Sequence, residues 1–62
     1  MINGVMPLMV ASLRGHFEVV SYLLLDYGVD IDARDDHGHN ALLLACHGGH
    51  LAVVSLLLEA RS

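Results

Sequence analysis

The stretch GHFEVVSYLL at residues 15–24 returns as GHLAVVSLLL at residues 49–58, at an offset of 34 residues. The same offset aligns residues 1–28 with residues 35–62, and ten of these 28 pairs are identical. Self-similarity at a period of about 20–50 residues is typical of proteins built from stacked repeats. The chain is therefore interpreted as two copies of one structural unit.

Each copy contains two apolar runs separated by a Gly-His pair. In the first copy the second run contains apolar residues at the i, i+1, i+4, i+5 spacing of a buried helical face, namely Val19, Val20, Leu23 and Leu24. Glycine ends helices by adopting the left-handed conformation, and Pro7 suits the first turn of a helix. The pattern predicts helices within residues 7–13, 17–26, 41–47 and 51–60.

The segment between the copies, YGVDIDARDDHG at residues 27–38, has no helical period. Gly28 is expected to end a helix, and Asp36-His37-Gly38 is expected to form a turn. The unit is thus helix, tight turn, helix and extended loop. Five of the seven acidic residues lie in or beside this loop: Asp26, Asp30, Asp32, Asp35 and Asp36.

A calcium site is one interpretation of these aspartates. It needs alternating oxygen ligands, a central glycine and a distal bidentate glutamate. The alternation fails at Arg34, and no glutamate follows before Glu59. A solvated loop with turn-forming aspartates is favoured instead, in which Arg34 pairs locally or reaches a partner.

Both copies resemble ankyrin repeats. The family pattern runs roughly D-x-x-G-x-T-P-L-H-x-A-A, then G-H-x-E-I/V-V, then L-L-L-x-x-G-A-D-V-N-A. The first copy reads NGVMPLMVASLRGHFEVVSYLLLDYGVDIDARD, and the second reads DDHGHNALLLACHGGHLAVVSLLLEA. Tetratricopeptide repeats share the 34-residue period and are the rival fold, but they lack the Gly-His break and the Gly-Val-Asp-Ile-Asp loop. The resemblance implies one all-α domain over residues 1–62. This domain would be an ankyrin solenoid of two helix-turn-helix units joined by a β-hairpin-like loop. Repeat one would occupy about residues 3–35 and repeat two about residues 36–62.

Two departures from the family pattern predict local differences. The family's Thr-Pro-Leu-His becomes MPLM at residues 6–9 and NALL at residues 40–43. The family uses that Thr and His to tie neighbouring loops together, so weaker ties or apolar packing are expected here. The usual period is 33 residues, so the extra residue is placed around Leu25 to Tyr27, where a local bulge is expected.

Composition narrows the class of protein. The chain has 62 residues, a net charge of −4 and a single cysteine. A nucleic-acid binder normally carries a basic stripe, whereas the three arginines here are scattered. The longest apolar runs are much shorter than the ~20 residues that cross a bilayer, and Met1 is followed by no basic n-region, so neither a membrane span nor a signal peptide is predicted. A lone cysteine fits a reducing compartment, so a cytoplasmic or nuclear location is predicted.

The histidines fall into two groups. His16 and His50 are equivalent, and each is expected to hydrogen-bond around its turn, as the family uses it, rather than act as a ligand or base. His37, His39 and His47 have no histidine counterpart in the first copy. Three imidazoles could hold zinc or switch charge between about pH 5 and 8. Because H-x-H plus a distant histidine matches no established ligand spacing, partner contact is favoured over metal.

Cys46 lies beside His47, which raises the alternative of a nucleophile with its base. Adjacent helical residues do not face each other, and no orienting acid lies nearby in the sequence. A buried, small side chain is therefore predicted for Cys46. No catalytic residue, metal or cofactor is predicted.

The resemblance implies a non-enzymatic module that binds a protein of unknown identity through its loop tips and first helices. The predicted partner-binding residues match the family's variable, exposed positions: Asn3, Val5, Leu13, Arg14, Arg34, Asp36, His37, His39 and His47. A second hypothesis follows from the rule that arrays need about three repeats with polar caps. In that hypothesis the chain is a truncated part of a longer array, or it self-associates through apolar terminal helices that contain Met1, Ile2, Val5, Met6 and Leu56 to Leu58. A metal-dependent enzyme that uses the histidines is the third and least favoured hypothesis.

Overall fold

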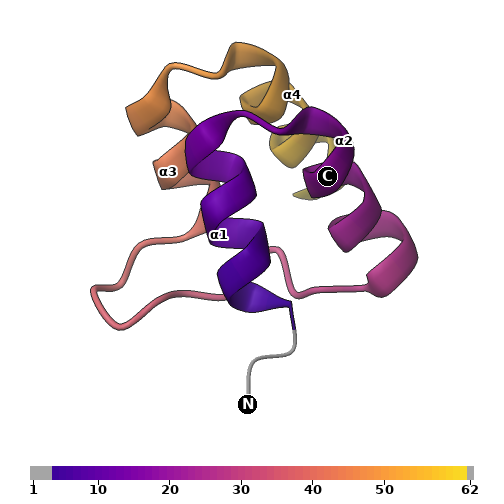
Figure 1. The fold of residues 1–62 in the computed structure, drawn as a ribbon, viewed down its shortest axis with the longest axis horizontal. Coiled ribbons are helices and arrows are strands. Elements are labelled where there is room, and N and C mark those ends of the chain that lie inside the picture. Colours follow the sequence, from indigo (N-terminus) through magenta and orange to yellow (C-terminus); the bar gives the residue numbers. More distant parts are fainter. Residues whose placement is uncertain (1–3, 62) are drawn as a thin grey trace.

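The fold of the computed structural model, which describes residues 4–61, consists of helices and loops (Figure 1). No strand is found within these residues, so the predicted all-α class is confirmed. Within the same range, no helix has the length and apolar character needed to cross a membrane. The elements in chain order are α1 (Val5–Arg14), α2 (Phe17–Tyr22), the π-helical turn η1 (Leu23–Tyr27), α3 (Ala41–Gly48) and α4 (Leu51–Arg61).

The ends of the helices follow from the residues at the turns. Gly15 ends α1 with φ 78° and Gly49 ends α3 with φ 74°, a left-handed conformation in which glycine carries no steric cost. Pro7 lies in the first turn of α1, as predicted. Asn40 caps α3, where its side-chain oxygen accepts the backbone N–H of Leu43 at 2.8 Å.

The extra residue of the 34-residue period is accommodated in η1. This turn continues α2 without a break and occupies Leu23–Tyr27, where the local bulge was predicted. A π-helical turn bonds residue i to residue i+5, so it holds one more residue per turn than an α-helix does. The N–H groups of Gly28 and Val29 both return to the carbonyl of Leu23. The extra residue is therefore taken up in a wider turn at the end of the helix.

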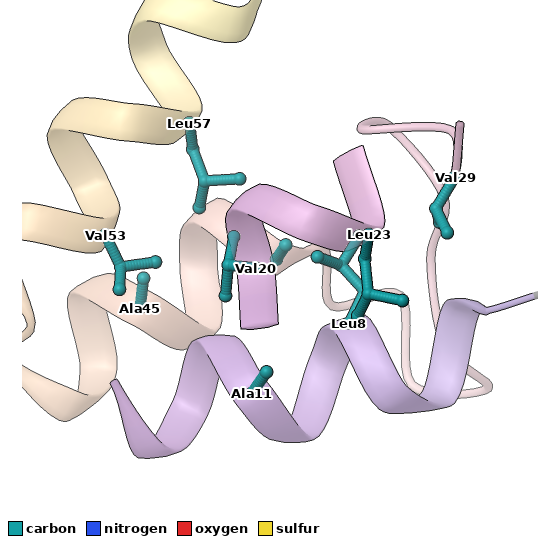
Figure 2. Packing of buried hydrophobic residues seen from close by; sticks show 9 residues of the cluster. Leu8, Ala11, Val20, Leu23, Val29, Ala45, Val53 and Leu57 are labelled. Carbon is teal, nitrogen blue, oxygen red and sulfur yellow. The ribbon is translucent and has the colours of Figure 1, made fainter. Parts of the chain in front are cut away.

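The core lies between the two helix pairs. Helix α1 packs against α3, and α2 packs against α4 (Figure 1). Small alanines on α1 and α3 allow these helices to approach closely, and the branched side chains of α2, η1 and α4 converge on them (Figure 2). The buried apolar cluster consists of Leu8, Ala11, Val20, Leu23, Val29, Ala41, Ala45, Val53 and Leu57. Leu57 had been predicted to lie on an exposed terminal face, and that prediction is wrong because α4 turns it into the core.

Cys46 is exposed, which contradicts its predicted burial. Its equivalent Ser12 is fully buried. The difference arises because the face of α1 that carries Ser12 meets the second repeat, while the same face of α3 is turned away from α1. Among residues 4–61, no third repeat covers that face.

The loop between the repeats is held by its aspartates. The Asp30 carboxylate accepts the N–H of Asp32 at 2.9 Å, and the Asp35 carboxylate accepts the N–H of His37 at 2.8 Å. Asp35 also donates its own N–H to the carbonyl of His39, which closes a hairpin-like turn. The predicted turn-forming role of these residues is confirmed.

Candidate partner-binding groove

A hollow of about 340 Å³ opens where the last turn of α1 meets α3. Leucines and imidazoles line it: Leu13, His39, Leu43, Leu44 and His47. We refer to these five residues as the groove. Leu43 and His47 stand one helical turn apart on α3, and Leu13 approaches from the last turn of α1.

The groove combines apolar surface with two polar groups. Leu13 is 39% exposed and Leu43 is 49% exposed, and both side chains line the same hollow. Clustered apolar surface bordered by a few polar groups is typical of a binding site. The imidazoles of His39 and His47 add hydrogen-bonding capacity at its edge.

A hydrogen bond links the two repeats beside the groove. The Nε2–H of His50 donates to the backbone carbonyl of Leu13 at 2.9 Å. The His50 ring packs closely against Gly15 and Gly48. A Cβ added at either glycine would collide with this ring. At Gly48, the added carbon would also lie 2.5 Å from the Leu13 carbonyl oxygen.

The two equivalent Gly-His turns thus use their histidines differently. His50 bonds to the neighbouring repeat, not around its own turn as predicted. His16 is exposed, and within residues 4–61 it has no bond that corresponds to the one made by His50. The acceptor of the His50 bond lies in the preceding repeat, and residues 4–61 contain no repeat before the one that carries His16.

The loop tip beside the groove is a compact polar structure. One oxygen of Asp35 accepts the N–H groups of His37 and His39, each at 2.8 Å, and the other oxygen lies 3.2 Å from Nδ1 of His39. The rings of His37 and His39 stack with their centres 5.9 Å apart. Arg34 donates from Nη1 to the carbonyl of Gly38 at 2.8 Å, so it pairs locally.

These bonds perturb the Asp35 carboxyl. The His39 N–H is the largest influence, and it lowers the pKa of Asp35 below the ordinary value of 3.8. Burial opposes this shift, and the bonds from the His37 N–H and the His39 ring add to it. Hydrogen bonds to a carboxylate favour its charged form, so Asp35 stays ionised to lower pH than a free aspartate.

The structure describes eight of the nine predicted partner-binding residues and places them in three different surroundings. Leu13, His39 and His47 line the groove. Arg14, Arg34, Asp36 and His37 are exposed outside it. Asn3 lies outside the described residues. Val5 is half-buried against the core, so the expectation that it is an exposed position is wrong.

Sequence reasoning missed Leu43 and Leu44 in the groove and Asp35 in the loop tip. A signal for each was present. The leucines lie three and four residues before His47, a spacing that puts them on one helical face. Asp35, His37 and His39 occupy alternate positions along the chain. The sequence had instead suggested the three histidines, with His47 in place of Asp35, as a possible metal site.

The chain is similar to proteins of one family. The family model for ankyrin repeats, in three copies, matches residues 2–62. The chain is 48% identical over 52 residues to XBOS32, a probable E3 ubiquitin-protein ligase of Oryza sativa subsp. japonica. The aligned segment covers 84% of this chain and 10% of that protein. It is 44% identical over 63 residues to human ankyrin repeat domain-containing protein 63. The aligned segment covers 92% of this chain and 16% of that protein.

A third relative is the DNA replication inhibitor plutonium of Drosophila melanogaster, 42% identical over 59 residues, with 95% of this chain and 33% of that protein covered. The chain therefore spans about a tenth to a third of the length of these three relatives. No solved structure matches the chain significantly. Ankyrin repeats generally mediate protein–protein interaction and are typically non-enzymatic. The Gly-His turns, the stacked helix pairs and the match over nearly every residue establish that this chain belongs to the ankyrin repeat family.

Proposed function

We propose that this chain is a non-enzymatic module that binds a partner protein through the groove and the adjoining loop tip. The observation that supports the proposal is the pair of exposed leucines, Leu13 and Leu43, which face one hollow from different repeats. Neither side chain is needed for the buried core. A partner that covers both would remove apolar surface from water, which contributes about 25 cal/mol for each Å² buried.

The polar rim gives such an interface its selectivity. His39 and His47 line the groove with the leucines, and the exposed ring of His37 stacks on that of His39. Apolar centres with polar rims are common in protein interfaces. Because turns and hydrogen bonds hold this backbone, its side chains can vary while the helices stay in place.

A matched pair of variants tests this proposal. Leu13→Asp places a charge in the groove, whereas Leu51→Asp makes the same change at a leucine that is 78% exposed and outside the groove. Affinity capture from extracts of the source cells should recover a partner with wild type and with Leu51→Asp, and lose it with Leu13→Asp. Equal recovery by both variants, with both shown to be folded by circular dichroism, would exclude the groove.

A second candidate function is head-to-tail stacking with another copy or with a further repeat. Met9 of the first repeat is 3% exposed, while its equivalent Leu43 is 49% exposed. Ser12 and Cys46 differ in the same direction. The second repeat thus displays the surface that the first repeat buries against it. A heterologous contact of this kind would extend the solenoid.

Sedimentation equilibrium under reducing conditions tests stacking. The mass of wild type should rise with concentration, Cys46→Asp should abolish this rise, and Cys46→Ser should keep it because serine occupies the equivalent buried position. A monomeric wild type across the whole range would exclude self-stacking.

Catalysis is not part of the proposal. Cys46 and His47 are neighbours on α3, so their side chains point about 100° apart and do not form a nucleophile–base pair. The intracellular location, based on the single cysteine, stays a prediction.

A further inference from the structure

We propose that Asp35, His37 and His39 form a binding site for a divalent transition-metal ion of the zinc class. The site lies at the loop tip and does not depend on the proposed partner-binding function. Each of the three residues offers one ligand atom, and these atoms lie within 4.8 Å of one another. The sequence pattern D-x-H-x-H places them close together without any contribution from distant parts of the fold.

The geometry of one pair already fits a tetrahedral ion. Oδ2 of Asp35 lies 3.2 Å from Nδ1 of His39. Two ligands bound to zinc at about 2.0–2.1 Å with a tetrahedral angle are separated by about 3.3 Å. The spacing of these two atoms therefore allows one ion to take the place of their hydrogen bond once the ring and the carboxylate turn toward it.

The backbone holds the ligands in position before an ion arrives. Oδ1 of Asp35 accepts the N–H groups of both His37 and His39, which leaves Oδ2 for the ion. The Arg34–Gly38 bond closes the turn from the other side. His37 supplies the third ligand, and its exposed ring can rotate toward the other two. Preorganised ligands reduce the entropy lost on binding.

The donor set selects the class of ion. Two imidazoles and one carboxylate suit zinc and its neighbours, whereas calcium and magnesium take oxygen ligands. Three protein ligands leave a fourth position open for water or another donor. The sequence had suggested His47 as the third nitrogen. In the structure His47 lines the groove, and Asp35 completes the set.

Isothermal titration of the metal-free protein with zinc chloride tests the site. All proteins carry Cys46→Ser, which removes the exposed thiol as a competing ligand. The parent should bind one ion. His37→Ala with His39→Ala should weaken binding by about tenfold or more. As the control, His16→Ala removes an exposed imidazole elsewhere and should leave the affinity within about twofold of the parent.

A single variant separates a loss of zinc binding from a loss of folding. His37→Ala alone changes an exposed ring that makes no side-chain hydrogen bond within residues 4–61, so it should fold normally and still weaken binding. In amide spectra of the parent, zinc should shift residues 35–39, and calcium should not. Absence of binding, a weakening by His16→Ala equal to that by His37→Ala, or a calcium response as strong as that to zinc would overturn the proposal.

Discussion

His50 and Leu13, which are 37 positions apart, are joined by a hydrogen bond of 2.9 Å from the imidazole Nε2–H to the backbone carbonyl. This bond connects the turn of the second repeat to the last residues of α1. It lies directly behind Leu13, whose side chain forms one wall of the groove. This contact adds to the packing of α1 against α3, which positions the two repeats and the groove between them.

Replacing His50 should loosen the contact between repeats. His50→Ala removes the bond to Leu13, and the expected loss in the free energy of unfolding is about 1 kcal/mol. His16→Ala at the equivalent position should change the free energy by less than about 0.5 kcal/mol, since its ring is exposed. Urea denaturation of both variants measures the difference. Equal losses would show that the histidine acts within its own turn.

Gly48 tests how closely the repeats approach. An alanine there usually improves a helix by about 1 kcal/mol. In this chain the added carbon would lie 2.5 Å from the carbonyl oxygen of Leu13, so α1 and α3 must move apart. Overpacking typically costs about 1–3 kcal/mol, so Gly48→Ala should lower stability overall. A higher denaturation midpoint than wild type would contradict the predicted approach.

Ser12 is the clearest position for a stabilising change. Its hydroxyl is buried and has no hydrogen-bond partner among residues 4–61. Leaving a buried polar group unpaired costs about 1–3 kcal/mol, so Ser12→Ala should raise the free energy of unfolding by about 1 kcal/mol or more. Ser55→Ala, on the exposed side of α4, should gain only the helix preference of alanine, about 0.5 kcal/mol. Thermal denaturation compares the two, and a loss at Ser12 would show that the hydroxyl is bonded.

The stability of the loop tip should fall at acid pH because Asp35 becomes protonated. Its folded-state pKa is lowered, chiefly by the N–H of His39. A lowered pKa means that ionised Asp35 stabilises the loop above its ordinary value of 3.8, and that this contribution is lost as pH falls through the lower folded value. In chelator-treated protein, the amide signals of His37 and His39 should shift together with the carboxyl titration below pH 3.8. Asp35→Asn should abolish that transition, and an Asp35 titration at or above the ordinary value would contradict the account.

Much of the fold was predictable because the same pattern of helices and turns occurs in both copies of the repeat. The Gly-His pairs mark the ends of α1 and α3, and the 34-residue offset located the bulge that became η1. These features depend on local conformational preferences, which sequence patterns describe well. The rival tetratricopeptide fold shares the 34-residue period and was set aside on the Gly-His pairs and the Gly-Val-Asp-Ile-Asp loop.

Burial was harder to predict, because equivalent positions in the two copies have different neighbours. Ser12 and Cys46 occupy the same place in the unit, but only Ser12 is covered by the following repeat. The groove was anticipated at Leu13, His39 and His47 but not at Leu43, whose counterpart Met9 is buried. A pattern within one unit does not specify what stacks against it.

The most direct test of the central proposal is an amide chemical-shift map of this chain on addition of its captured partner. The account predicts that the shifts concentrate at Leu13, His39, Leu43, Leu44 and His47 and extend to the loop tip at residues 34–37. Shifts centred on the start of α4, around Leu51, with the groove signals unchanged, would contradict it.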